Sequence, residues 1–183
     1  DEGEDQLLRR FFAYVERARP RLVGWNSSGF DLPCLLYRAM AHQLSLESFY
    51  RQRNYRYRYN EDIHLDLMDL LAGYGATVRV ALDEMAAVLR LPGKLGVDGQ
   101  DVWPLYRQGR IDVIRAYCET DVLTTTLIFA RYAAHRRLLD QARSAALVES
   151  IEQFLAQASG PHFREFREAW EALDPDHGRP PSS

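Results

Sequence analysis

The stretch Trp25-Asn26-Ser27-Ser28-Gly29-Phe30-Asp31-Leu32-Pro33 decides which kind of fold this chain can adopt. An apolar run of strand length, 21–25, leads into it, and its Asn, Ser and Gly residues are typical of a turn. A helix from Phe30 to about Gln43 should follow, because proline is tolerated in the first turn of a helix. The sequence therefore predicts a strand that turns directly into a helix.

Helical periodicity dominates the rest of the chain. Apolar residues recur at three- and four-residue spacing, which predicts helices over 5–19, 81–91, 101–108, 110–136, 142–158 and 162–172. Few segments are left for strands, and a complete α/β sheet needs more of them. Either the protein is mostly α-helical or its sheet begins before residue 1.

The composition is that of one globular domain with a real core, since 46% of the 183 residues are hydrophobic. The formal net charge of −3 gives no overall basic field. That balance argues against a protein that coats nucleic acid, but not against one that cuts it. The sequence opens with no signal peptide and contains no apolar stretch of membrane-spanning length, so we expect a cytoplasmic protein with no membrane partner.

Cysteine and histidine usage gives no sign of a zinc site. Cys34 and Cys118 fit neither a disulfide framework nor zinc-ligand spacing, and we predict that both are small buried residues in a reducing compartment. His64 has no second His or Cys at ligand spacing, so we interpret it as a structural hydrogen-bonding residue.

Asp31 is the first candidate for chemistry. It should lie at the N-terminus of a helix, where backbone N–H groups and the helix dipole favour a carboxylate. Taken alone, Asp31 could simply cap that helix, and Phe30 could simply be a core residue.

Tyr117 and Asp121 are the second candidate. They are four residues apart on the long predicted helix and so share one face. Alone, this pair could be an ordinary polar patch on an amphipathic helix. Together with Asp31, it offers the hard oxygen ligands that Mg²⁺ prefers, and a two-metal site of about 4 Å spacing could hydrolyse a phosphodiester.

Four segments in the same order strengthen this interpretation. They are Trp25–Pro33, His64–Leu71, Pro92-Gly93-Lys94-Leu95-Gly96 and Tyr117-Cys118-Glu119-Thr120-Asp121-Val122. Asn26-x-x-x-Phe30-Asp31 and Tyr117-x-x-x-Asp121 resemble the second and third motifs of the DEDDy 3′→5′ exonucleases, which have an RNase H-like fold. Over residues 5–132 the chain resembles a bacterial family of predicted exonucleases related to the exonuclease domain of family-B DNA polymerases.

The resemblance implies a metal site. Asp31 and Asp121 match two of the family's four metal-binding acids, and Tyr117 matches the tyrosine that positions the nucleophilic water. All three are therefore expected to be catalytic residues. The implied cofactors are Mg²⁺ or Mn²⁺, with two ions in the complete domain.

The resemblance also implies contacts with the substrate. Asn26 and Phe30 match residues beside the substrate strand. Lys94 matches a loop lysine near the scissile phosphate. Asp66 matches a recurrent acidic position to which we assign no role.

One motif of the family is missing. The family's first motif is Asp-x-Glu on an early strand, where a spacing of two places both acids on one face. Glu2-Gly3-Glu4 has the spacing but no strand around it, and Asp174-Pro175-Asp176 lies near the other end. We therefore expect an α/β, RNase H-like exonuclease fold whose first strands precede residue 1, and a chain that is inactive or feeble by itself.

The segment Tyr55-Arg56-Tyr57-Arg58-Tyr59 alternates, so as a strand it would carry tyrosines on one face and arginines on the other. Stacking rings and cationic groups suit single-stranded nucleic acid. An edge strand or loop with core tyrosines and solvated arginines is the alternative.

The expected organisation is an exonuclease domain over 1–139, a C-terminal helical extension over 140–173 that packs against the domain or a partner, and a disordered tail over 174–183. The expected function is metal-dependent 3′→5′ hydrolysis of single-stranded DNA from its 3′ end. The alternatives are an inactive RNase H-like module that binds nucleic acid or protein, and an exoribonuclease. The sequence does not indicate the oligomeric state.

Overall fold

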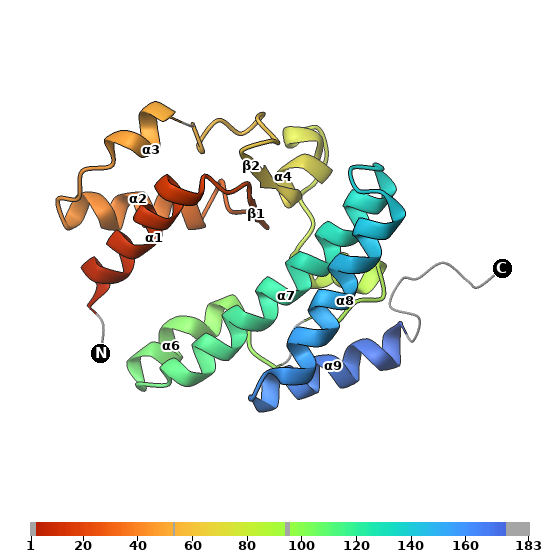
Figure 1. Cartoon of the computed structure of the whole chain (residues 1–183). Helices are drawn as coiled ribbons and strands as arrows, with labels where there is room; N and C mark the ends of the chain where they lie inside the picture. The colour runs from red at the N-terminus through yellow and green to blue at the C-terminus, as the bar shows by residue number, and fades with distance from the viewer. Residues whose placement is uncertain (1–2, 53, 94–95, 175–183) are drawn as a thin grey trace. The chain divides into compact units, whose positions relative to one another are not determined.

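The computed structural model describes residues 3–52, 54–93 and 96–174 (Figure 1). The chain divides into two compact units, Asp1–Arg79 and Val80–Ser183, which we describe separately. This division falls inside the segment 1–139 that we assigned to one domain, and our domain assignment stays a prediction. Residues 175–183 of the predicted tail lie outside the described residues.

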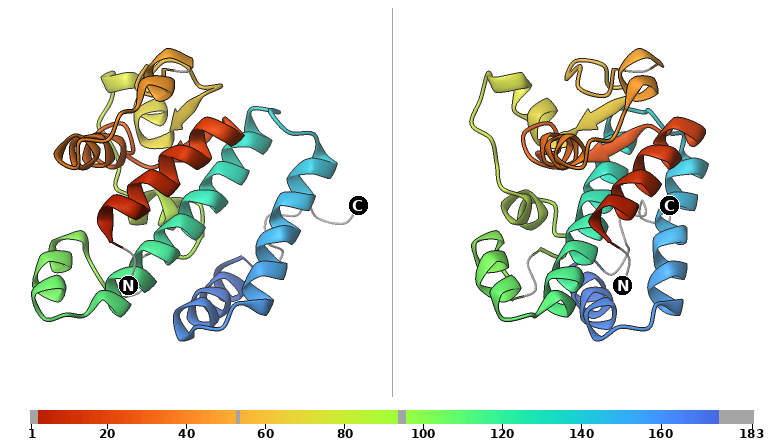
Figure 2. Two further views of the ribbon diagram at one scale, coloured as in Figure 1. Left: turned by 60° about the vertical axis from the view of Figure 1, so that its left-hand side comes forward. Right: turned by 90° about the vertical axis from the view of Figure 1, so that its left-hand side faces the viewer.

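Unit 1 contains a small parallel sheet with helices packed around it. Strand β1 (Leu22–Gly24) pairs with β2 (His64–Asp66) in the register Leu22↔His64, Val23↔Leu65 and Gly24↔Asp66. Figure 2 shows the pair beside the unit's helices. The bounds of these helices are α1 Glu4–Ala18, α2 Asp31–Ala41, α3 Glu47–Gln52 and α4 Leu67–Leu71, followed by the 3-10 turn η1 Gly73–Gly75.

The core of unit 1 is built from the periodic apolar positions of its helices. Helix α1 buries Leu8, Phe12 and Val15 at helical spacing. Phe12 makes an edge-to-face contact with Phe49 of α3, and the two ring centroids are 5.4 Å apart, a separation that aromatic pairs prefer. Phe49 in turn stacks on Tyr55, which is only 2% exposed.

Unit 2 is helical among its described residues. Its elements are α5 Leu82–Val88, η2 Gly99–Asp101, α6 Val102–Arg107, α7 Ile111–His135, α8 Gln141–Gln157 and α9 Pro161–Leu173. The long helix α7 contacts α5, α6, α8 and α9. Phe166 and Trp170 of α9 are almost fully buried, so the predicted packing of the C-terminal helices is confirmed.

The predicted helices are therefore confirmed, with end points shifted by a few residues. The coarse class is a helix-rich α/β mixture with a two-stranded parallel sheet. Within the described part of the chain, no helix has the length and apolar character needed to cross a bilayer.

Two local predictions are wrong. Cys34 and Cys118 are both exposed, because each lies on the outward side of its helix. For residues 55–59 the sequence left open a two-faced strand and an edge strand or loop, and the structure shows a loop with turns. Tyr55 is buried there while Tyr57 and Tyr59 are more than half exposed.

The burial of α9 gives a first testable expectation. Phe166→Ala should lower the free energy of unfolding by about 3–5 kcal/mol, because it removes a fully buried ring and leaves a cavity. Phe154 is 49% exposed and makes one edge contact with Phe163, so Phe154→Ala should cost only about 1 kcal/mol. Urea unfolding followed by circular dichroism measures both, and equal losses would contradict the packing of α9.

A candidate active site

The turn between β1 and α2 adopts a backbone that depends on its residue types. Asn26 has φ of 57°, in the left-handed region that asparagine tolerates better than most residues. Its carbonyl accepts from the N–H groups of Gly29 and Phe30 at 3.0 and 2.9 Å. A Cβ added to Gly29 would lie 2.5 Å from the Asn26 side-chain oxygen, so a larger residue there would require the Asn26 side chain to move.

The carboxylate of Asp66 holds this turn in place by accepting hydrogen bonds from its backbone. Asp66 is 5% exposed and ends β2, directly opposite Gly24 of β1. Its Oδ1 accepts from the Asn26 N–H at 3.0 Å, and its Oδ2 accepts from the Ser28 N–H at 2.8 Å. Oδ1 also accepts from the Asp69 N–H at 3.2 Å, which caps α4. A buried carboxylate is costly unless hydrogen-bonded, and here three backbone donors compensate it.

His64, two residues earlier on β2, fixes the same turn through a side chain. Its Nε2 lies 2.8 Å from Ser27 Oγ, and its Nδ1 lies 3.0 Å from the Tyr55 carbonyl. A carbonyl can only accept, so Nδ1 donates to it and Nε2 accepts from the Ser27 hydroxyl in the neutral ring. Burial lowers the pKa of His64. The predicted hydrogen-bonding role of His64 is thus confirmed.

Asp31 is the first residue of α2, and Phe30 occupies the N-cap position before it. Asp31 is therefore not the capping residue that we considered, although it lies in the favourable first turn. Desolvation by the surrounding protein raises the pKa of the Asp31 carboxyl, and the negative charge of Asp66 adds to this effect. Phe30 is 67% exposed, so the alternative that it is a core residue is wrong.

A second buried carboxylate, Asp69, lies one helical turn beyond Asp66. Arg58 donates to it twice, from Nε at 2.8 Å and from Nη2 at 2.5 Å, and Arg79 donates from Nη2 at 3.0 Å. These groups border a cavity of about 230 Å³ next to the β1–α2 turn. Its remaining walls include Asn26 and Gly29.

In unit 2, Tyr117 and Asp121 both lie on α7, four residues apart, as the sequence predicts. An added Cβ at Gly99 would lie 3.8 Å from the Tyr117 hydroxyl, so the start of η2 borders this side chain. Between the two, Glu119 is 2.8 Å from His162 Nε2 of α9. The C-terminal helix thus contacts the very turn of α7 that carries the motif.

The expected site residues accordingly form two groups. The β1–α2 turn brings together Asn26, Phe30 and Asp31, and α7 brings together Tyr117 and Asp121. The two groups belong to different units, and their convergence stays a prediction. Lys94 lies outside the described residues. Within 3–52, 54–93 and 96–174, no three His, Cys, Asp or Glu side chains are grouped so that they could hold a metal ion.

The residue that sequence reasoning left without a role is Asp66. The signal was available, because Asp66 and Asp69 stand in an otherwise apolar run, where buried acids require partners. The sequence did not indicate which groups would donate hydrogen bonds to these acids. They are backbone N–H groups for Asp66 and guanidinium groups for Asp69.

Comparison with known protein families identifies the chain. A family model described as "Predicted 3'-5' exonuclease related to the exonuclease domain of PolB" matches residues 1–170. The chain belongs to this family. Comparisons with curated proteins and with solved structures give no match.

The bonding of Asp66 leads to a stability prediction. Asp66→Ala should lower the free energy of unfolding by about 3 kcal/mol, because it leaves buried N–H groups of the turn without an acceptor. Amide hydrogen exchange at Asn26 and Ser28 should accelerate in the variant. Glu16 is an exposed carboxylate of the same unit, so Glu16→Ala is a matched control with little expected effect. Unchanged exchange at Asn26 and Ser28 would show that Asp66 does not fix the turn.

The lowered pKa of His64 predicts a pH dependence. Burial places the folded-state pKa below the ordinary 6.5, so the unfolded chain takes up the proton more readily. The stability that His64 contributes is fully present above about pH 6.5 and is lost as the pH falls through the folded-state pKa. The urea midpoint should fall between pH 7 and pH 5, and this part of the fall should vanish in His64→Gln. A variant with the same pH profile as the parent would refute the assignment.

Proposed function

We propose that this chain is the greater part of an RNase H-like, metal-dependent 3′→5′ exonuclease that removes nucleotides from the 3′ end of single-stranded DNA. The observation that carries this proposal is the family match over 1–170, together with Asp31, Tyr117 and Asp121 at the positions of the motifs. An exonuclease-related family implies a nucleic-acid substrate and hydrolysis of phosphodiester bonds.

The donor chemistry of the proposed site suits hard divalent cations. Asp31 and Asp121 offer carboxylate oxygens, which are the ligands that Mg²⁺ and Mn²⁺ take. Two such ions, when bound, activate the attacking water and stabilise the leaving oxygen of a phosphodiester. The family resemblance gives four acids to the site, so we also propose that an Asp-x-Glu strand encoded upstream of Asp1 contributes the other two.

The chain's own residues divide the remaining tasks. Asp31, on a turn that is fixed by buried hydrogen bonds, is a pre-organised carboxylate, which limits the reorganisation needed on binding. Tyr117, one helical turn from Asp121, has a hydroxyl that can orient the nucleophilic water. Asn26 and Phe30 lie on the same turn as Asp31, and the exposed Phe30 ring can stack against a terminal base.

The test uses the full-length gene product and a 5′-labelled single-stranded oligonucleotide with Mg²⁺. We expect shortening by single nucleotides from the 3′ end, which EDTA abolishes. Asp31→Asn and Asp121→Asn should each slow this at least about 100-fold, because each removes a carboxylate that would hold a catalytic divalent cation. Tyr117→Phe should slow hydrolysis by about 10²–10⁴-fold, which is the range that positioned acid–base groups contribute.

Asp112→Asn is the control on the same helix, because Asp112 is exposed and pairs only weakly with Arg110 at 3.3 Å. It should hydrolyse at the parental rate. An Asp121→Asn variant that cuts as fast as the parent would refute the metal-site assignment. A matched RNA oligonucleotide distinguishes the exoribonuclease, and a gene product that lacks both an upstream Asp-x-Glu strand and any cleavage would indicate an inactive binding module.

A further inference from the structure

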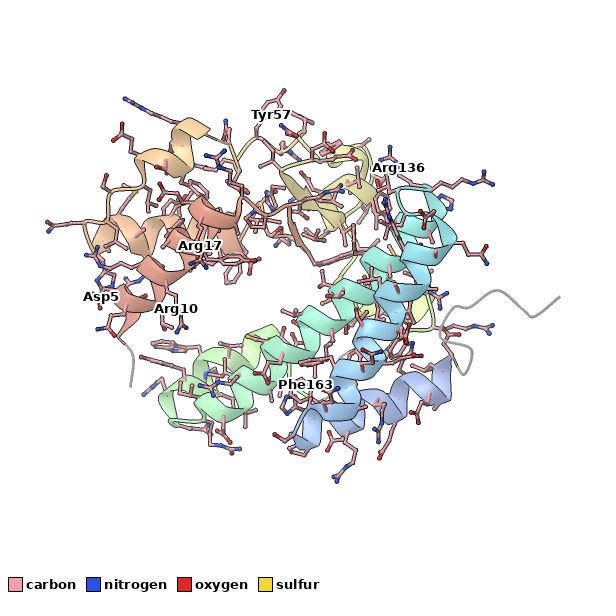
Figure 3. The ribbon with its side chains drawn as sticks, viewed as in Figure 1. Asp5, Arg10, Arg17, Tyr57, Arg136 and Phe163 are labelled. Carbon is pink, nitrogen blue, oxygen red and sulfur yellow. The ribbon has the colours of Figure 1, made fainter. Side chains whose placement is uncertain are left out.

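The proposed chemistry does not use the Tyr- and Arg-rich loop of unit 1. Residues 54–60 run past the cavity described above, and the side chains of Arg56 and Arg58 line it together with Arg79. Aromatic residues of the same loop lie beside these arginines, and Tyr57 is seen on the loop in Figure 3. Neither catalysis nor the core requires this concentration of cations and exposed rings.

The arginines leave positive charge at the cavity. Arg58 and Arg79 share the single carboxylate of Asp69, so one of their two charges is not compensated by it. Arg56 is exposed and forms no ion pair with any residue that the structure describes. The Asp66 carboxylate is directed at backbone N–H groups. Three arginines and two aspartates line the cavity, so the formal charge of its lining is +1 (3 − 2), although the whole chain is acidic.

Asp69 also positions the cations. It is buried, while the Arg58 and Arg79 side chains remain 37% and 51% exposed. Their guanidinium groups thus have one side fixed by a buried acceptor and another side open to solvent. A guanidinium held in this way loses little side-chain entropy when it binds a second anion. The cavity of about 230 Å³ is far larger than a single water molecule needs.

Three tyrosine rings lie in a series of contacts that begins at Arg58. The Arg58 guanidinium lies 5.6 Å from the Tyr59 ring centroid and 5.9 Å from that of Tyr74. Tyr59 contacts Tyr74 at 4.9 Å and Tyr57 at 5.8 Å between centroids. Tyr57 and Tyr59 are 54% and 55% exposed, so both rings are accessible at the surface.

The backbone at Tyr74 has a conformation that is rare for tyrosine. Gly73, Tyr74 and Gly75 all have positive φ, of 58°, 55° and 103°. For a bulky residue such as tyrosine this conformation is strained and persists only where surrounding contacts enforce it. Here the Tyr74 hydroxyl donates to Glu61 at 3.2 Å while its ring contacts Tyr59.

From these observations we propose that Arg56, Arg58, Arg79, Tyr57, Tyr59 and Tyr74 form a binding face, the Arg–Tyr face, for single-stranded DNA. The arginine cavity receives a backbone phosphate, and the exposed tyrosine rings stack on neighbouring bases. The inference rests on the proposed exonuclease function and adds a site for the nucleotides that precede the scissile 3′ end. The cavity borders Asn26 and Gly29 of the turn that carries Asp31, so one strand can reach both.

The mixture of groups favours single-stranded over duplex DNA. Aromatic side chains stack on unpaired bases, which expose their faces, whereas bases in a duplex are already stacked on each other. Arginine alone would bind the backbone of either form. The tyrosines therefore make the face prefer single-stranded over duplex DNA, and the arginines make the affinity depend on salt concentration.

The test measures binding without cleavage. Fluorescence anisotropy of a 5′-fluorescein-labelled oligothymidylate of about a dozen nucleotides is recorded in EDTA, over a series of salt concentrations. Arg56→Ala should weaken binding and reduce the slope of log affinity against log salt by about 0.7, because one phosphate is no longer neutralised by the protein. Tyr57→Ala should weaken binding at least about five-fold and leave the slope unchanged, because stacking involves no counterion release.

Matched controls come from α1 of the same unit. Arg9→Ala removes another exposed positive charge, and Tyr14→Ala removes a ring that is 52% exposed, but neither residue borders the cavity. Both should bind the oligonucleotide as the parent does. Circular dichroism of all four variants should match the parent, since none of these side chains is buried.

Three results would overturn the Arg–Tyr face. The first is binding by Arg56→Ala and Tyr57→Ala that equals that of the parent at every salt concentration. The second is no binding of the single-stranded oligonucleotide by the parent in EDTA. The third is equal binding of a duplex of the same length. A parent that binds the strand but fails to cut it with Mg²⁺ would instead refute the proposed activity and leave the binding face standing.

Discussion

The geometry of unit 1 depends on one buried negative charge, the carboxylate of Asp66. An ionised carboxylate in an apolar interior is strongly disfavoured unless several hydrogen bonds compensate it. Its hydrogen bonds come from the backbone N–H groups of Asn26, Ser28 and Asp69, and the positive charge of Arg58 adds a favourable electrostatic interaction. The turn must therefore bring its amides to β2, and the parallel pairing of Gly24 with Asp66 makes this possible. Because the start of α2 follows directly from that turn, the position of Asp31 is a consequence of the same constraint.

The short segment from His64 to Asp69 supplies three buried polar side chains, and each is satisfied by a different kind of partner. His64 pairs with a hydroxyl and a carbonyl, Asp66 with backbone amides, and Asp69 with two arginines. The hydrogen bonds of His64 and Asp66 hold the backbone of the β1–α2 turn in place. Those of Asp69 hold two arginine side chains that stay partly exposed. One strand end thus organises both the turn of the proposed metal ligand and the surface that we propose binds the strand. Low local dielectric makes such networks rigid when every member is satisfied.

Much of the fold followed from the sequence because helical periodicity is a strong local signal. The amphipathic helix α1 and the long helix α7 could be predicted from the spacing of their apolar residues alone. For residues 55–59 the sequence left a strand and a loop open, because alternation of Tyr and Arg has the period of a strand whatever its neighbours do. The conformation of this loop is decided by distant partners: Phe49 buries Tyr55, and Asp69 binds Arg58.

The sequence names candidate site residues, whose roles stay predictions, but it does not reveal which contacts hold those residues in place. Asp31, Tyr117 and Asp121 could be named from motifs, since motif residues are set by chemistry that many folds share. The role of Asp66 depends on strand register, and register is a long-range property that one sequence does not reveal. The exposure of Phe30 and of Cys34 likewise depends on how α2 is rotated against the core, which residue type alone does not specify.

Helix α7 is held in place by packing, whereas the β1–α2 turn is held in place by hydrogen bonds. Its buried residues begin at Thr120 and continue to Ala133, while residues 111–119 bury none. Packing against α5, α8 and α9 therefore immobilises the later part of the helix, and hydrogen-bonded helical geometry carries that rigidity forward to Tyr117. The contact of Glu119 with His162 reinforces the first turn before the packed region. Side chains on a rigid helix keep their spacing more accurately than side chains on a loop, and water-positioning chemistry requires that accuracy. The C-terminal helices, which carry no motif, thereby contribute to the proposed site by supporting the helix on which it lies.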